Sequence, residues 1–100
     1  MSASADPVLH GRAARFVLSA TAIKHAGLLD RTTADEVLRL SKAVKFFVEA
    51  HDYGLARLTL GLFAEVLEES KVAKDTDVAV AVTKHVAGIR QRITINAKGA

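Results

Sequence analysis

The segment from Leu55 to Leu67 most constrains the fold, because it is apolar on almost every side when wound as a helix. It carries two adjoining apolar stripes, which are Leu55, Leu58, Leu62 and Val66 on one side and Ala56, Leu60, Phe63 and Leu67 on the other. A helix of this kind belongs inside a hydrophobic core, with other helices on at least two sides. We therefore expect an all-α protein organised around a helix over residues 55–70. We also expect Leu62→Asp to unfold it, because that substitution would bury an unpaired charge.

A first helix is predicted over residues 7–26. Asp6 and Pro7 suit its start, since an Asp side chain accepts hydrogen bonds from free helical N–H groups and Pro fits the first turn. Gly27 suits its end, where glycine commonly follows the last helical residue. Its expected core stripe is Leu9, Ala13, Phe16, Ala20 and Ile23.

A second helix is predicted over residues 33–52. It opens on a capping-box pattern, in which the Thr33 hydroxyl and the Glu36 carboxylate each satisfy an N–H group at the helix start. Its expected buried side is Val37, Leu40, Val44, Phe47 and His51, with Phe46 and Val48 widening it.

The last apolar segment has two competing periods. Val78, Val80 and Val82 alternate with Ala as in a strand, yet a helical stripe also runs from Val78 to Ile93. The run is too long for a typical strand, so we predict a helix over residues 76–92, followed by an extended stretch over 93–96. Together the segments predict one domain, residues 1–100, folded as a compact antiparallel four-helix bundle, with 1–5 and 97–100 disordered.

Residues 40–68 resemble one tetratricopeptide helix pair with its turn. The positions that carry the resemblance are Leu40, Phe47, Asp52, Tyr53, Ala56 and Leu60. Val44 stands where that family prefers Gly and Phe63 where it prefers Ala, and no second copy follows at the period of about 34 residues that repeats require. The resemblance therefore implies a helical hairpin with shared packing rules, and not a repeat array.

Composition narrows the setting. The chain has no Cys, which excludes disulfides and thiolate metal sites and is compatible with a reducing cytoplasm. No apolar run reaches the roughly 20 residues that cross a bilayer, and the first residues lack the order of a signal peptide. We expect a cytoplasmic domain with no membrane partner.

Residues that could carry chemistry are scattered. His51 and Asp52 are adjacent, but neighbouring helical residues point about 100° apart and no further ligand follows at metal-binding spacing. His10, His25 and His85 are isolated in sequence, and whether they converge in space is left open. There is no glycine-rich phosphate loop and no nucleophile elbow. We expect no enzyme activity, no metal, no cofactor and no small-molecule substrate.

The charge pattern supports one function class. Residues 78–100 contain bases and no acid, and the candidate nucleic-acid contacts are Lys84, Arg90, Arg92 and Lys98, which Arg12 and Arg15 could join. The bases follow an apolar helix start, and no aromatic residues are interleaved to stack on bases. Nucleic-acid binding is therefore the alternative hypothesis.

Apolar residues in excess of one small core favour a protein–protein interaction module of the adaptor, regulator or inhibitor type. The predicted interface has an apolar centre and a charged rim, formed by Phe46, Leu60, Val80, Arg90 and Arg92. Segments of opposite net charge could match reciprocally across a twofold axis. We therefore predict a homodimer, or a complex with another protein.

Overall fold

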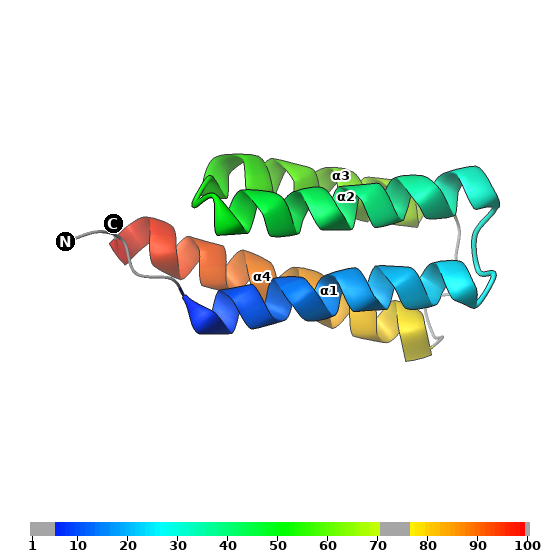
Figure 1. Cartoon of the computed structure of the whole chain (residues 1–100), viewed down its shortest axis with the longest axis horizontal. Helices are drawn as coiled ribbons and strands as arrows, with labels where there is room; N and C mark the ends of the chain where they lie inside the picture. The colour runs from blue at the N-terminus through cyan, green and yellow to red at the C-terminus, as the bar shows by residue number, and fades with distance from the viewer. Residues whose placement is uncertain (1–5, 71–76, 100) are drawn as a thin grey trace.

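The computed structural model describes residues 6–70 and 77–99, which form four α-helices. Helix α1 spans Pro7–His25, α2 spans Arg31–Glu49, α3 spans Tyr53–Glu69 and α4 spans Asp77–Gly99. Consecutive helices are antiparallel, and α4 lies beside α1 (Figure 1). The bundle has two layers, α2 with α3 and α1 with α4. The predicted all-α four-helix fold is confirmed.

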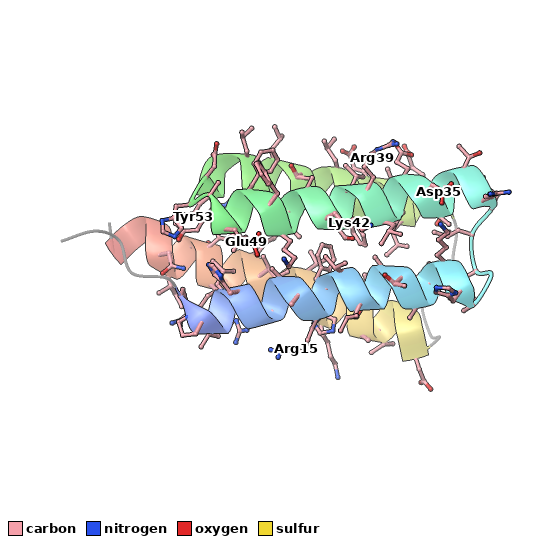
Figure 2. All side chains as sticks on the ribbon, viewed as in Figure 1. Arg15, Asp35, Arg39, Lys42, Glu49 and Tyr53 are labelled. Carbon is pink, nitrogen blue, oxygen red and sulfur yellow. The ribbon has the colours of Figure 1, made fainter. Side chains whose placement is uncertain are left out.

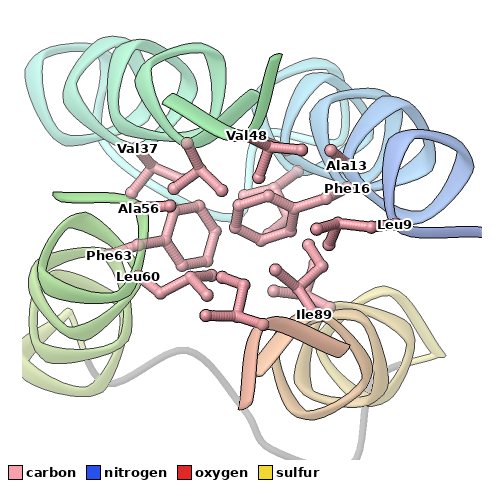
Figure 3. Packing of buried hydrophobic residues seen from close by; sticks show 14 residues of the cluster. Leu9, Ala13, Phe16, Val37, Val48, Ala56, Leu60, Phe63 and Ile89 are labelled. Atoms are coloured by element: carbon pink, nitrogen blue, oxygen red, sulfur yellow. The ribbon is translucent and has the colours of Figure 1, made fainter. Parts of the chain in front are cut away.

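All four helices contribute to one hydrophobic core (Figure 3). At its centre the rings of Phe16 and Phe63 meet with centroids 4.6 Å apart and planes inclined at 58°. This aromatic pair joins α1 to α3 across the bundle. The buried residues around it are Leu9, Ala13, Ala20, Ile23, Val37, Val44, Val48, Ala56, Leu60, Val82, Ile89 and Ile93.

Helix α3 buries one of its two apolar stripes. Ala56, Leu60 and Phe63 have no exposed surface, whereas Leu55, Leu58 and Leu62 are 43%, 61% and 45% exposed. The physical reason is that a helix in a four-helix bundle turns only one side toward the shared core. The prediction of an α3 buried on nearly all sides is therefore wrong. The expectation that Leu62→Asp would bury an unpaired charge is also wrong, because Leu62 is exposed.

The predicted start of α1 is confirmed and that of α2 is wrong. The Asp6 carboxylate accepts from the backbone N–H groups of Val8 and Leu9, and Pro7 opens the helix. Helix α2 begins two residues before Thr33, because the Asp30 carboxylate accepts from the Thr33 N–H and serves as the N-cap. A side-chain oxygen placed three residues earlier thus replaces the predicted capping box.

The end of α2 also differs from the prediction. The helix stops at Glu49, and His51 is exposed with a left-handed φ of 60°. Because the chain has left the helix by this point, His51 does not join the buried side. Phe46 does not join it either: its side chain is 63% exposed.

Helix α4 settles the ambiguity between strand and helix. Val82 is fully buried while Val80 is 40% exposed, as expected for residues about 200° apart on a helix. The predicted extended stretch over 93–96 is wrong, because Ile93 continues the buried stripe and the helix runs on through residues 97–99. The predictions for residues 1–5, for residue 100 and for the polar link over 71–76 lie outside the described residues.

Candidate binding groove

The α3 edge of α4 carries an apolar groove. Helix α4 contacts α1 far more extensively than it contacts α3, and an open groove with a volume of about 680 Å³ follows the α3–α4 boundary. Its lining is Phe63, Ala64, Leu67, Glu68, Ala79, Val80, Val82, Thr83, Lys84, Val86, Ala87 and Arg90. Small side chains keep it open, since Ala79, Thr83 and Ala87 recur at every fourth position of α4 and so share one side of the helix.

The groove has an acidic contribution from α3 and a basic one from α4. Glu68 comes from α3, while Lys84 and Arg90 come from α4, and all three are exposed. Within the described residues none of them forms an ion pair. The two sides of the groove therefore carry opposite charges around an apolar floor.

One hydrogen bond and one close approach indicate the register of α3 against α4. Arg57 donates from Nη2 to the Thr94 hydroxyl at 3.1 Å, and a Cβ on Gly61 would lie 3.9 Å from Nη2 of Arg90. Because the helices are antiparallel, moving four residues forward on α3, from Arg57 to Gly61, corresponds to moving four residues back on α4, from Thr94 to Arg90. Seven residues further along α3, Glu68 is then level with Thr83, which precedes Lys84 in the sequence. The two opposite charges therefore lie at the same height along the groove.

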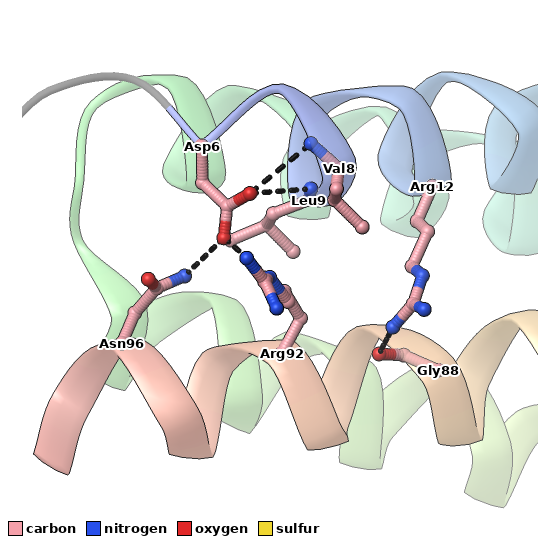
Figure 4. A network of polar contacts seen from close by, with 7 residues as sticks. All are labelled: Asp6, Val8, Leu9, Arg12, Gly88, Arg92 and Asn96. Carbon is pink, nitrogen blue, oxygen red and sulfur yellow. Dashed lines mark hydrogen bonds and ion pairs between the residues drawn. The ribbon is translucent and has the colours of Figure 1, made fainter. Parts of the chain in front are cut away.

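The other edge of α4 is closed by polar bonds to α1 (Figure 4). Nε of Arg92 and Nδ2 of Asn96 donate to Oδ2 of Asp6 at 2.6 and 2.9 Å, and Nη1 of Arg12 donates to the Gly88 carbonyl at 2.8 Å. Burial raises the pKa of Asp6, but the hydrogen bonds from Arg92 and Asn96 outweigh it and lower that pKa to about 2. Asp6 therefore caps α1 and holds α4 against it.

The residues predicted for a protein interface do not form one surface. Val80 and Arg90 line the groove, but Leu60 is fully buried in the core and Arg92 is bonded to Asp6. Phe46 is exposed on α2, which contributes no residue to the groove. Sequence reasoning missed Ala64, Thr83 and Ala87, although the four-residue spacing of small residues on α4 was a signal for them.

The predicted nucleic-acid residues are also dispersed. Lys84 and Arg90 line the groove, Arg92 belongs to the α1–α4 contact, and residue 98 has a described backbone only. By contrast, the packing of α1 beside α4 brings Arg12 onto the Gly88 turn of α4. The same packing brings the positive charge of Arg15 near His85.

The histidines lie on different parts of the bundle, and no group of three or more potential metal ligands occurs among the described residues. Partial burial and the positive charge of Arg15 lower the pKa of His85. Across the same residues, every buried side-chain nitrogen and oxygen has a hydrogen-bond partner. Of the helices described, none has both the length and the apolar character needed to cross a membrane.

No protein-family model, no curated protein and no solved structure matches this chain. A function must therefore be inferred from the chain's own residues. Among the described surfaces, the α3–α4 groove combines an apolar floor with side chains of opposite charge.

Proposed function

We propose that the protein is a non-enzymatic protein–protein interaction module of the adaptor or regulator type, and that it self-associates through the α3–α4 groove. The observation that carries this proposal is an open apolar groove flanked by opposite charges. Apolar surface of this kind is removed from water when a second helical surface covers it.

The charges select a second copy of the chain as the occupant. A twofold axis along the groove, parallel to α3 and α4, keeps each residue at its own height and lays α3 of one copy over α4 of the other. Glu68 of each copy then meets Lys84 of the other copy, on both sides of the axis. A twofold axis across the groove would instead lay α3 on α3 and lose this match. Charge complementarity of this kind specifies the register of an interface.

Val80 supplies the first test, because it lines the groove and is 40% exposed in the monomer. Light scattering after size exclusion should give twice the chain mass of 10.7 kDa for the wild type. Val80→Asp should give the monomer mass, since it places a charge in the apolar centre of the interface. Leu18→Asp is the matched control: Leu18 is 67% exposed on α1, away from the groove, and should leave the dimer intact. A wild-type monomer up to about 100 μM would overturn self-association.

Reversing the charges tests the pairing itself. Glu68→Lys and Lys84→Glu should each weaken the homodimer, because like charges then face each other at two places. Mixing the two variants should restore a dimer, since Lys at position 68 of one copy meets Glu at position 84 of the other. If both variants are monomeric and their mixture stays monomeric, the parallel axis is wrong. If neither variant weakens the dimer, these charges lie outside the interface.

A further inference from the structure

Charge is segregated between the two layers of the bundle. In the sequence of α1 there is no Asp or Glu, and in that of α4 there is one, Asp77 at its first residue. The acids of the helical segments otherwise belong to α2 and α3, as Asp35, Glu36, Glu49, Glu65, Glu68 and Glu69. Because α1 and α4 lie side by side, two helices far apart in sequence form one layer that is nearly free of acids (Figure 1).

Arg12 and Arg15, the cationic face, belong to α1 and lie one turn apart in this layer. Arg12 crosses from α1 to donate to the Gly88 carbonyl, which uses only one of its five N–H donors (Figure 4). The Arg15 guanidinium lies over Gly11, where a Cβ would be 3.5 Å from its Nη1. Gly88 and Gly11 thus lie beneath the Arg12 and Arg15 side chains.

Arg12 and Arg15 have no acidic partner among the described residues, and on α4 the same holds for Lys84 and Arg90 of the groove. Lys24 is paired with Asp35 at 2.8 Å, and Arg92 is paired with Asp6. The positive charge of Arg12 and Arg15 is therefore not neutralised within the described part of the molecule.

We propose that the cationic face binds the phosphate backbone of a double-stranded nucleic acid without reading its bases. Guanidinium groups present paired N–H donors that match phosphate oxygens. Phe16 is the one aromatic residue of α1, and it is fully buried, while α4 has none. Stacking on unpaired bases is thereby disfavoured relative to backbone contact.

Two alternatives fit less well. A membrane surface calls for many bulky apolar side chains among the bases, and the exposed ones described on α1 are two, Val8 and Leu18. An acidic protein could be bound by isolated cations. The phosphates of a duplex repeat at a fixed spacing and therefore favour cations spaced along a rigid helix, as Arg12 and Arg15 are. The site also differs from the groove, which lies on the other edge of α4, so both can be occupied together.

The test is fluorescence anisotropy of the full chain with labelled duplex DNA and duplex RNA of about 20 base pairs. If two or three phosphates are contacted, affinity should fall about 12- to 40-fold between about 50 and about 200 mM salt. Arg15→Glu should weaken binding about tenfold at the lower salt and flatten the salt dependence. Arg39→Glu is the matched control with the same change in net charge, because Arg39 is exposed on α2, on the opposite side of the bundle (Figure 2).

Binding to either duplex, with a loss specific to Arg15→Glu, supports the proposal. Equal losses in Arg15→Glu and Arg39→Glu overturn it, because they would reflect overall charge and not this face. No binding at low salt overturns it as well. Preferential binding to vesicles of phosphatidylserine and phosphatidylcholine would assign the face to a membrane surface instead. Thermal stability should match wild type in both variants, since both side chains are exposed.

Discussion

The two edges of α4 meet their neighbours in different ways. Toward α1, Arg92 and Asn96 bond to Asp6, and the Gly88 carbonyl accepts from Arg12. Toward α3, the side-chain bond is between Arg57 and Thr94, and beyond it the boundary opens into the groove. The comparison teaches that polar bonds hold α4 mainly against α1, while its α3 edge keeps open apolar surface. The α3 edge is then available for binding without loss of the shared core.

The largest expected change in the free energy of unfolding tests whether α3 is fully buried on the side that faces the core, although its edge toward α4 is open. Leu60→Asp should destabilise the domain by more than about 4 kcal/mol, because Leu60 is fully buried and the new charge would have no partner. Leu62→Asp, two residues away and 45% exposed, should change the free energy of unfolding by less than about 1 kcal/mol. Urea denaturation measures both. Similar losses in the two variants would show that α3 is buried on both stripes.

A smaller loss is expected at the closed edge. Asp6→Ala removes the α1 cap together with the acceptor for Arg92 and Asn96, and should cost about 2 to 3 kcal/mol. Asp30→Ala removes an exposed cap from α2 and should cost less than Asp6→Ala. Thermal and urea unfolding compare the two. Equal losses would mean that the bonds from α4 to Asp6 contribute nothing beyond capping.

The same carboxylate makes the closed edge sensitive to acid. The pKa of Asp6 is lowered to about 2 from an ordinary 3.8, so its stabilisation is fully present above the ordinary value and lost as the pH falls toward 2. Asp6→Asn should therefore lower the melting temperature at neutral pH, and its deficit should shrink between about pH 5 and pH 2. A deficit that stays constant over this range would exclude ionisation of Asp6 as its source.

The smallest expected change in stability tests how much space lies between α3 and α4 at Gly61. Gly61→Ala should stabilise the domain by about 0.5 to 1 kcal/mol, because Ala favours the helix interior and the nearest atom to the new Cβ is the far end of Arg90. Gly27→Ala should have the opposite sign, since Gly27 has a φ of 69°. Destabilisation by Gly61→Ala would indicate that α3 and α4 pack more closely than the groove implies.

Local signals predicted much of the fold. Asp6, Pro7 and Gly27 bounded α1 to within a residue, because capping depends on near neighbours in sequence. The capping box at Thr33 failed because Asp30 competed for the same N–H group. The end of α4 was misplaced because a short alternating stretch looks extended on its own, while Ile93 is buried by helices distant in sequence.

The candidate groove was less predictable. Val80 and Arg90 were recognised as surplus apolar and charged residues, and they do line it. Leu60 was equally apolar and belongs to the core, and Arg92 was equally basic and belongs to the α1–α4 contact. Residue type alone does not separate these roles, because each depends on which helix lies opposite.

By itself, the sequence determined that this chain forms four amphipathic helices, since helical periodicity and most end signals act over a few residues. The tertiary structure alone decided which stripe of α3 is buried and which edge of α4 stays open. The stripe of α3 is chosen by the core residues of the other helices, and the position of α4 is held by bonds that Asp6 forms with residues 86 and 90 positions away; no local pattern records such partners. Because those bonds hold α4 against α1, the α3 edge is left with the apolar surface that a partner can cover.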